Sequence, residues 1–462
     1  MHASALRRRT VTHVENATTE LADGENPSGA GPDDAPAPVP LTQPRDGVPT
    51  PLTTPDELAA AVAALRADGD GGVRLPIAID AERASGYRYG QRAYLVQLRR
   101  EDVGTMLFDP VYLPDLSTLG AVIADDEWVL HAASQDLPCL SEVGLHATRV
   151  FDTELAGRLL GYAKVGLGSI VEEVLGLTLE KGHSAADWST RPLPEPWIRY
   201  AALDVEVLVE LRDFLAAQLD ESGKRGWAEE EFAAIVAAQP APPRVEPWRR
   251  TSGMHRVRRR RDLAVVRALW ERRDELAQQR DISPGRVLPD LAIVEAALAG
   301  PTTEVELVKL PLWGGRSLRR QGPTWLPAIL SAIALPDSAL PDVKARHEGP
   351  PPARSWAERD PAAAARLSAA RTTVVAIAER NHLPVENLLS PDMLRRVMWE
   401  PPEPVDAATI GEALRGHGAR PWQVALTAAP IAAALLEPPA AEPEEPVTPT
   451  PTGEPPGPPA SP

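Results

Sequence analysis

Two carboxylates stand two residues apart in the segment IDAE, residues 79–82, at the end of an apolar run. Side chains two apart on a strand point to the same face of a sheet, so Asp80 and Glu82 would converge at the end of the strand. Oxygen ligands of this kind suit a hard cation such as Mg²⁺ or Mn²⁺. The pair alone also fits two solvated acids in a turn, so a metal site needs further ligands.

A third acid follows a second predicted strand, in the segment VLHAASQD, residues 129–136. We expect the strand to run into His131, a turn of small residues to follow, and a helix to carry Asp136. This order would bring a third carboxylate to the same edge of the sheet. Taken alone, Asp136 also fits a first-turn acid that the helix dipole favours, and His131 fits a structural histidine.

A fourth acid and a phenol stand four residues apart in the segment YAALD, residues 200–204. Residues four apart lie on one face of a helix, so the Tyr200 hydroxyl would lie one turn before Asp204 and face the same site. A tyrosine at this spacing also fits packing in a core.

Taken together, these segments predict a site for two cations. Four acids around one cleft repel one another unless cations bind between them. A pair of divalent ions about 3.5–4 Å apart would relieve that repulsion and could drive hydrolysis. One ion would lower the pKa of a bound water, and the other would stabilise the leaving oxygen and the charge on a phosphate.

The elements that must position these residues form a mixed α/β pattern. Short apolar runs between turn residues predict strands at Pro76–Asp80, Tyr94–Leu98, Met106–Asp109, Trp128–Leu130 and Arg149–Phe151. Helical patterns lie at Leu116–Ala124, Glu154–Tyr162, Leu167–Leu175 and Glu195–Gln218, and a capping box of Thr54 and Glu57 predicts an earlier helix start. Strands that pair locally and then alternate with helices favour a mixed sheet with helices on its faces.

From about residue 255 onward the strand patterns stop. Helical patterns lie at Arg261–Arg280, Leu288–Leu298, Glu304–Leu310 and Leu326–Ala334, and a second helical block runs from about Ala353 to Leu436. Both blocks contain a long helix, a turn with proline (DISPGRVLP and NHLPVENLLSP) and shorter helices, which indicates a diverged internal repeat. Residues 1–48 and 437–462 are rich in Pro and polar residues and predict disordered tails.

Composition limits the classes of protein. The 462 residues include 50 prolines and one cysteine, Cys139, so no disulfide can form within the chain. No apolar run approaches the roughly 20 residues of a membrane span, and the N-terminus lacks the apolar segment of a secretory signal. We therefore expect a cytoplasmic protein with no membrane contact.

Charge gives a mixed indication about nucleic acids. The formal net charge of −17 argues against a polyanionic partner, because phosphates bind Lys and Arg. The segment 249–261 nevertheless contains seven arginines and could either follow an RNA backbone or be a solvated linker.

The complete set of motifs resembles a known enzyme family. Asp80-x-Glu82, His131-x4-Asp136 and Tyr200-x3-Asp204 look like the three exonuclease motifs of the DEDD superfamily, in its tyrosine branch. The phrases HAASQDL and DWSTRPL closely resemble ribonuclease D, over about residues 52–220. The helical blocks resemble the helicase-and-RNase-D C-terminal (HRDC) domain, most clearly at residues 255–335.

The resemblance implies a fold and a domain plan. It implies a ribonuclease-H-like 3′→5′ exonuclease domain with a mixed sheet, followed by two all-helical HRDC-like domains. The expected boundaries are a tail at 1–48, the exonuclease domain at 49–240, an HRDC domain at 241–337, a linker at 338–352, a second HRDC-like domain at 353–436 and a tail at 437–462.

The resemblance also implies roles for the site residues. Asp80 would bridge two Mg²⁺ or Mn²⁺ ions, Glu82 and Asp204 would hold the ion that carries the water, Asp136 would help place the second ion, and Tyr200 would orient the water. The products would be nucleoside 5′-monophosphates released from RNA 3′ ends, such as those of tRNA precursors. Arg83 stands where the family commonly has an apolar residue, which could change how the terminal nucleotide binds.

Other functions stay open at this point. DNA could replace RNA as the substrate, since nothing in the sequence identifies a contact to a 2′-hydroxyl. A nuclease fold without activity that only binds nucleic acid is a further alternative, although binding alone would not need four acids and Tyr200. No segment matches G-x-x-x-x-G-K-[ST], so helicase activity within the chain is unsupported. The sequence leaves the oligomeric state open.

Overall fold

The computed structural model describes residues 37–66, 74–180, 182–239, 242–344 and 349–436. The described residues from Val39 onward belong to one compact unit. The predicted tail at 437–462 and residues 1–36 of the other predicted tail lie outside the described residues. Among the helices that are described, none is both long and apolar enough to span a bilayer.

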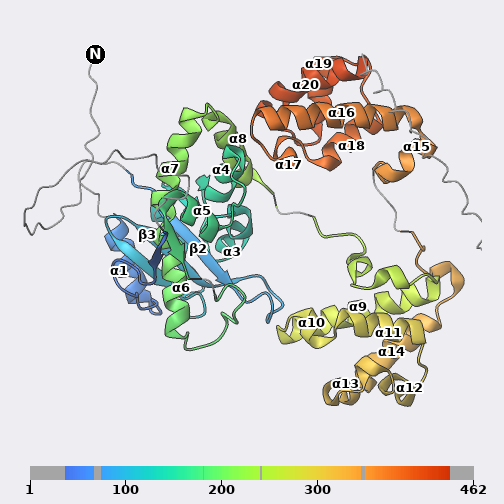
Figure 1. The fold of residues 1–462 in the computed structure, drawn as a ribbon. Coiled ribbons are helices and arrows are strands. Elements are labelled where there is room, and N and C mark those ends of the chain that lie inside the picture. The colour runs from blue at the N-terminus through green and yellow to red at the C-terminus, as the bar shows by residue number, and fades with distance from the viewer. Residues whose placement is uncertain (1–36, 67–73, 181, 240–241, 345–348, 437–462) are drawn as a thin grey trace, which may run out of the picture. The chain divides into compact units, whose positions relative to one another are not determined.

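A five-stranded mixed sheet carries Asp80 and Glu82 on its central strand (Figure 1). Its strands are β2 (Ile77–Arg83), β3 (Ala93–Arg100), β4 (Gly104–Phe108), β5 (Glu127–Leu130) and β6 (Arg149–Asp152), in the order β4-β3-β2-β5-β6. The pairs β2–β3 and β3–β4 are antiparallel, whereas β2–β5 and β5–β6 are parallel. All five predicted strands and the mixed sheet are therefore confirmed.

Both faces of the central strands are buried. Along β2 the side chains of Ile77, Ala78 and Ile79 are all at most 1% exposed, although neighbours on a strand point to opposite faces. Continuous apolar runs are typical of strands that helices cover on both sides. Residues just before Asp80 are therefore all apolar and do not alternate with polar residues.

Eight α-helices of the described residues precede, connect or follow the strands of this sheet. They are α1 (Pro55–Arg66), α2 (Ser117–Ile123), α3 (Leu137–Glu142), α4 (Thr153–Leu160), α5 (Leu167–Leu175), α6 (Glu195–Glu206), α7 (Leu208–Glu221) and α8 (Arg225–Ala237). The predicted capping box is present at the start of α1. The Thr54 amide donates to Glu57 at 2.9 Å, and the Glu57 amide donates to the Thr54 hydroxyl at 3.3 Å.

The single helix predicted at Glu195–Gln218 is wrong, because the chain turns at Val207 between α6 and α7. Val207 is fully buried, and the flanking Val205 and Leu208 pack with Ala78 of β2 and Val129 of β5. Val207 has no strong helix-breaking tendency, so packing against the sheet sets the break. The break ends α6 shortly after Asp204.

A second correction concerns the predicted N-terminal tail. Residues 39–41 form strand β1 (Val39–Leu41), which pairs in parallel with β7 (Leu177–Leu179). The disorder expected throughout 1–48 is therefore wrong for these residues. Backbone hydrogen bonds to a distant segment order them, and local composition cannot reveal such a partner.

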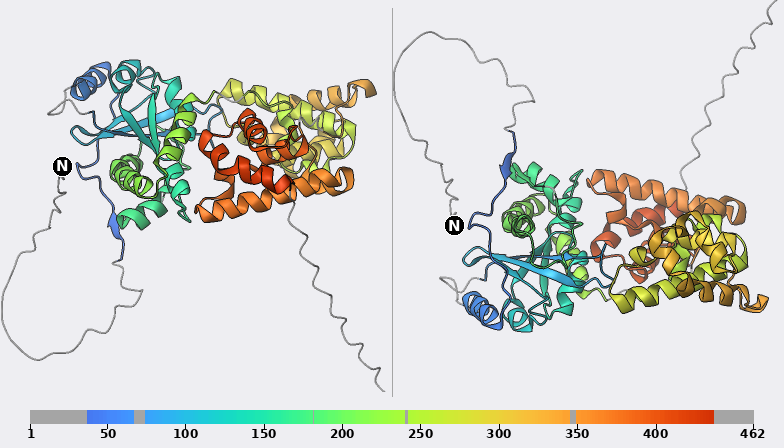
Figure 2. Two further views of the ribbon diagram at one scale, coloured as in Figure 1. Left: turned by 90° about the horizontal axis from the view of Figure 1, so that it is seen from above. Right: turned by 90° about the horizontal axis from the view of Figure 1, so that it is seen from below.

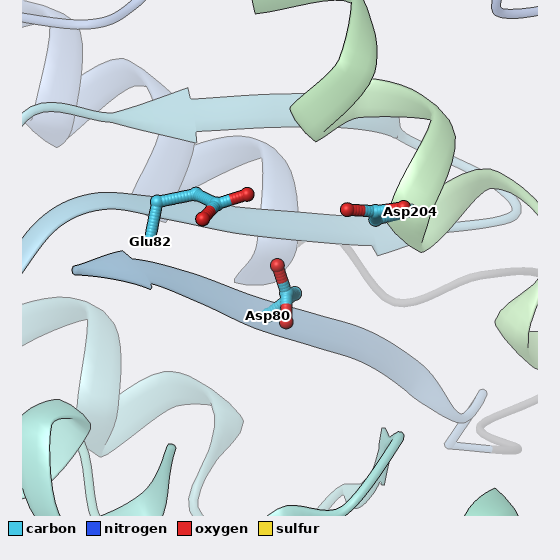
Figure 3. Close-up of side chains that lie close together, drawn as sticks. All are labelled: Asp80, Glu82 and Asp204. Atoms are coloured by element: carbon cyan, nitrogen blue, oxygen red, sulfur yellow. The ribbon is translucent and has the colours of Figure 1, made fainter. Parts of the chain in front are cut away.

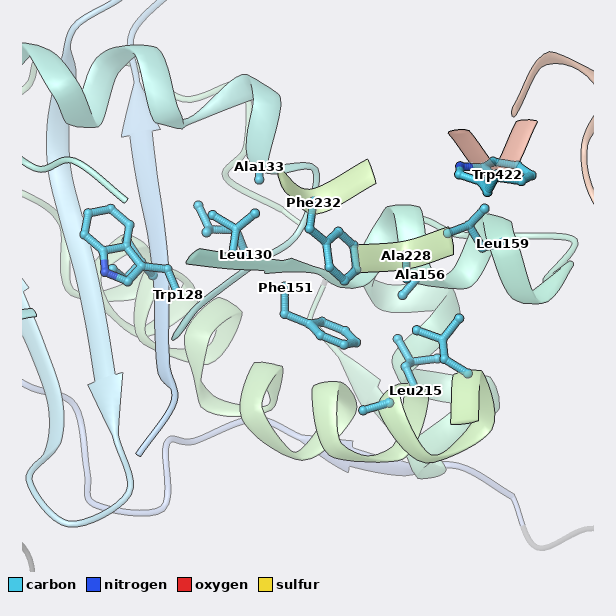
Figure 4. Packing of buried hydrophobic residues seen from close by; sticks show 14 of the residues in the cluster. Trp128, Leu130, Ala133, Phe151, Ala156, Leu159, Leu215, Ala228, Phe232 and Trp422 are labelled. Carbon is cyan, nitrogen blue, oxygen red and sulfur yellow. The ribbon is translucent and has the colours of Figure 1, made fainter. Parts of the chain in front are cut away.

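The core of the exonuclease region lies between the sheet and its helices (Figure 4). Trp128 and Leu130 of β5 are fully buried, and the Trp128 indole donates to the carbonyl of Ile123 at 2.9 Å. Phe151 of β6 packs against Phe232 of α8, with ring centroids 4.9 Å apart. These contacts hold β5, which pairs with β2, and β6, which pairs with β5, against the helices.

The described chain from α9 onward is entirely helical (Figure 2). Its α-helices are α9 (Arg260–Arg280), α10 (Pro284–Val287), α11 (Asp290–Ala299), α12 (Glu304–Val308), α13 (Arg316–Arg320), α14 (Gly322–Ile333), α15 (Trp356–Arg359), α16 (Pro361–Arg380), α17 (Val385–Leu388), α18 (Pro391–Trp399), α19 (Ala407–Gly416) and α20 (Pro421–Leu436). The predicted absence of strands beyond residue 255 is confirmed for the described residues.

Candidate active site

Three of the predicted acids meet at one place. Each of Asp80, Glu82 and Asp204 offers a carboxylate oxygen, and these oxygens all lie within 4.8 Å of one another. Figure 3 shows the two β2 side chains and Asp204 of α6 facing one another. The carboxylates thus come from segments more than 120 residues apart in the chain.

The sheet and α6 together create this convergence. Asp80 and Glu82 lie on the same face of β2, opposite Gln97 and Leu95 of β3. The register shifts between Glu82 and Arg83, and such bulges bend a strand and redirect its side chains. Helix α6 packs over β2, β3 and β4, and this places Asp204 above the pair.

The three carboxylates are costly to ionise where they lie. Burial raises the pKa of Asp80 to about 6. Burial also raises the pKa of Glu82 well above its usual value, and repulsion from Asp80, Asp204 and Asp136 adds to this increase. The pKa of Asp204 is raised by burial and by the charge of Asp80. A bound cation would remove this cost, since it replaces water and cancels the repulsion.

Asp136 borders the same cavity but is not a member of the three-carboxylate group. The sequence predicts that Asp136 lies within a helix. It instead lies at the N-cap of α3, between a short 3₁₀ turn and the helix. Burial and the charge of Asp80 raise the pKa of Asp136 to about 8. Arg83 forms an ion pair with it at 3.5 Å, which gives this unexpected arginine a definite position beside the site.

Asp152 is a positioning residue that the sequence did not identify. Its buried carboxylate accepts hydrogen bonds from the amides of Ala132 and Ala133 at 3.1 and 2.9 Å. It also caps α4 by accepting from Glu154 and Leu155. Ala132 has a φ of 63°, so the turn before Asp136 needs such support. The sequence Asp-Thr-Glu indicates that Asp152 caps a helix. It does not indicate that Asp152 also accepts from the amides of Ala132 and Ala133.

His131 has a structural environment and also borders the cavity. Its Nδ1 lies 2.9 Å from the Thr153 hydroxyl, which donates to the carbonyl of Leu130 at 3.1 Å. Both hydrogen bonds form together when the Thr153 hydroxyl donates to Leu130 and Nδ1 donates to that hydroxyl. Burial lowers the pKa of His131 to about 4, so the ring is neutral at physiological pH.

Tyr200 lies beside Asp204, as the four-residue spacing predicts. Burial is the main cause that raises the pKa of Tyr200 above its usual value, and nearby Asp204 and Glu82 add to the increase. A hydrogen bond joins its hydroxyl to Asp204. The ring packs edge-on against His183 at 5.8 Å and near Trp188 at 6.5 Å. Trp188 itself is fully buried, so it packs under Tyr200 and has no exposed face for a base.

Arg191 holds the segment that carries Trp188 against the sheet. Its guanidinium forms two hydrogen bonds with Asp109, at 2.7 and 2.6 Å. It also donates to the carbonyls of Tyr94 and Trp188, each at 2.7 Å. Asp109 and Tyr94 are far from Arg191 in the sequence, and the contact with Trp188 belongs to no regular helix or strand. No local sequence pattern therefore identifies Arg191 as the residue that holds this segment, a role for which we call it a clamp.

The acids face an open cavity of about 790 Å³. The other residues around it belong to the β2 end, the turn after β5 and the segments near 166 and 182–186. A cavity of this size can hold a nucleotide. Carboxylates alone supply the donors, and an all-oxygen set fits Mg²⁺ or Mn²⁺ better than zinc or copper.

Comparisons with protein families agree with this site. Residues 49–220 match the family described as 3′-5′ exonuclease, and residues 262–329 match the HRDC domain. Residues 349–435 match the family described as 3′ to 5′ exonuclease C-terminal domain. One HRDC domain is therefore confirmed, and the second helical block matches a different description.

Individual relatives give the same result over most of the chain. Ribonuclease D of Gluconacetobacter diazotrophicus is 33% identical over 317 residues, which cover 66% of this chain and 78% of the relative. A solved protein from Bifidobacterium adolescentis is 38% identical with a TM-score of 0.78, covering 86% of this chain and all of that one. The structure of Escherichia coli RNase D, an exoribonuclease involved in structured RNA processing, gives 27% identity and a TM-score of 0.60, covering 79% and 97%. The chain belongs to the ribonuclease D family and is a metal-dependent 3′→5′ exoribonuclease.

Proposed function

We propose that the chain trims the 3′ ends of structured RNAs, such as tRNA precursors, and releases nucleoside 5′-monophosphates one at a time. The observation that carries this proposal is the group formed by Asp80, Glu82 and Asp204, whose oxygens lie within 4.8 Å of one another. The relative from Escherichia coli, which is involved in structured RNA processing, supports this choice of substrate.

We further propose that two divalent ions bind here, held by Asp80, Glu82, Asp204 and Asp136. When bound, they would supply positive charge to a phosphate and lower the pKa of an attacking water. Burial raises the pKa values of all four acids, and repulsion from neighbouring acids adds to the increase at Glu82, Asp136 and Asp204, so the site favours bound positive charge. Arg83, paired with Asp136, adds a fixed positive charge on that side of the site.

Tyr200 would orient the water and would not act as a base. Its raised pKa keeps the phenol protonated at physiological pH, so the hydroxyl can donate to Asp204 or to a nearby water. Packing of the ring against His183 and Trp188 limits its movement. A neutral hydroxyl with a fixed direction lowers the entropy cost of placing the nucleophile.

The second helical block would be a diverged copy of the HRDC domain. In both blocks a helix of about 20 residues (α9, α16) leads, one or two residues later, into a residue with positive φ, Asp281 at 48° and His382 at 51°. A four-residue helix follows in each, and then a helix of about ten residues. The shared order supports the predicted repeat and the proposed division near residues 338–352.

Digestion of end-labelled oligonucleotides tests the function. A 5′-labelled RNA with a free 3′-hydroxyl should shorten stepwise in Mg²⁺ or Mn²⁺, and a 3′-phosphate should block the reaction. Asp80→Asn should lower the rate at least about 10³-fold, because a ligand shared by the cations is lost. RNA binding in Ca²⁺ should survive this change.

The same experiment separates the alternatives. Faster digestion of a DNA of the same sequence would reassign the substrate class. No metal-dependent hydrolysis of either polymer by the wild type, with binding intact, would leave a binding protein with an inactive nuclease fold.

A further inference from the structure

A second cavity lies in the helical region and has a cationic lining. It measures about 420 Å³ and lies between the segment 244–250, α9 and the loop 339–344. No residue borders both this cavity and the one that contains the carboxylates. We refer to it as the cationic cavity.

The predicted arginine cluster at 249–261 only partly contributes to it. Arg249 and Arg260 are used to build the wall. Arg249 donates to the carbonyl of Asp342 at 2.9 Å, and Arg260 donates to the carbonyls of Leu340 and Pro341 at 2.7 and 3.1 Å. These bonds hold the loop against the start of α9, so the cavity has a defined shape.

Other members of the cluster have intramolecular roles as well. Arg259 pairs with Asp262 at 2.9 Å, and Arg261 donates to the carbonyls of Ile333 and Leu335. Most of the charge that suggested a basic surface is therefore neutralised or used for backbone contacts. Of the seven arginines, Arg249 and Arg250 border the cavity.

Four cations around the cavity have no partner among the residues that the structure describes. They are Arg244, Arg250, Arg267 and Lys344, and three of them are exposed. Two acids also border the cavity, of which Glu246 is already paired with Arg249 at 2.7 Å. Like charges gathered around one opening repel one another, and an anion would relieve that repulsion.

The arrangement favours an extended anion over a single ion. The four cations come from three separate segments, which surround an opening far larger than one phosphate needs. The whole chain carries a net charge of −17, so a polyanion needs a local cationic surface to bind at all. Arg offers paired donors that match phosphate oxygens.

We propose that the cationic cavity binds the phosphodiester backbone of RNA, away from the 3′ end that is hydrolysed. This inference rests on the proposed function and names a second contact for the same substrate. It would increase affinity for long RNAs without changing the chemical step.

Fluorescence anisotropy with labelled single-stranded RNA in Ca²⁺ tests the site in the full chain. For a 30-nucleotide RNA, Arg250→Ala/Arg267→Ala should raise the Kd about tenfold at 0.1 M salt. The slope of log Kd against log salt should become shallower by about 0.7 for each lost phosphate contact. Arg250→Ala/Lys344→Ala should show the same trend. Because both of its positions are exposed, this variant excludes misfolding caused by the loss of the half-buried Arg267 as the reason for weaker binding.

A matched control removes the same charge elsewhere. Arg371 on α16 and Arg415 on α19 are exposed, and their side chains have no hydrogen bond or ion pair within the described residues. Their double alanine variant should leave Kd and salt slope unchanged within about twofold. If it weakens binding as much as the cavity variants, the effect is one of net charge and the proposal is wrong.

Hydrolysis of a dinucleotide separates this proposal from the proposed function. The two cavity variants and the control variant should cleave a dinucleotide in Mn²⁺ at the wild-type rate within about twofold. Unchanged Kd and salt slope in the cavity variants, with hydrolysis intact, would overturn the cationic cavity alone. Failure of the wild type to hydrolyse RNA or a dinucleotide would overturn the proposed function, whereas the binding measurement would still report on the cavity.

Discussion

At the scale of single residues, the site depends on groups that the protein keeps in costly states. Four acids have raised pKa values, of which Glu82 and Asp136 are buried and Asp80 and Asp204 are half-buried, and Tyr200 is held as a neutral phenol among them. Structures keep such groups where a bound ligand or a reaction uses them. Tyr200 differs from the four acids because it is neutral. Its hydroxyl interacts with the Asp204 carboxylate and adds no charge to the site.

Tyr200→Phe should therefore separate water orientation from metal affinity. We expect kcat to fall about 10²-fold, the size of effect that one positioned hydrogen-bonding group contributes. Affinity for Mn²⁺ should change less than about threefold, because all four carboxylates remain. Single-turnover digestion and calorimetric titration with Mn²⁺ measure the two quantities. An unchanged rate would remove Tyr200 from the mechanism.

At the scale of elements, loops and helix ends are held by long-range side-chain contacts. The segment with Trp188 depends on Arg191, whose side chain is 15% exposed and whose partner Asp109 is 3% exposed. This segment also limits the movement of Tyr200, because the ring of Trp188 packs near the ring of Tyr200. The stability of the clamp and the geometry of the site are therefore linked.

Arg191→Met should destabilise the protein by about 3–5 kcal/mol, because it leaves the Asp109 carboxylate buried and unpaired. The double variant Asp109→Asn/Arg191→Met should recover part of this loss, since no charge is then buried alone. Urea unfolding of the three proteins measures both effects. Equal unfolding midpoints for wild type and Arg191→Met would contradict the assignment of Arg191 as a clamp.

At the scale of the whole molecule, much of the exonuclease fold follows from the sequence. Apolar runs such as Tyr94–Leu98 predict strands because both sheet faces are covered, and the spacing of Asp80 and Glu82 predicts their common face. The turn at Val207 and the pairing of Val39 with Leu177 could not be predicted, since neither has a local signal. The second role of Asp152 and the pairing of Arg191 with Asp109 escape prediction, because only folding brings these distant partners together.

The carboxylates also give the whole protein a characteristic dependence on pH. Unfolded carboxyls have pKa values near 4, whereas in the fold Asp80 has a pKa of about 6 and Asp136 a pKa of about 8. The metal-free folded state therefore binds more protons than the unfolded state in this window. Its free energy of unfolding has the full contribution of these groups below about pH 4 and loses it as pH rises to about 8.

Thermal unfolding in EDTA tests this dependence. Asp80→Asn should raise Tm by several degrees at pH 8 and have little effect at pH 5, because Asp80, with a pKa of about 6, is ionised mainly at the higher pH. Saturating Mn²⁺ at pH 8 should stabilise the wild type and not the variant. A variant that is less stable than the wild type in EDTA at pH 8 would contradict the repulsion inferred here.

The most direct test of the site is anomalous X-ray diffraction from a crystal soaked in Mn²⁺ with a nucleoside 5′-monophosphate. The account predicts Mn²⁺ peaks between Asp80, Glu82 and Asp204, within about 2.3 Å of their oxygens, and a second peak that Asp136 shares. No Mn²⁺ bound at this group of carboxylates at saturating concentration would contradict the account.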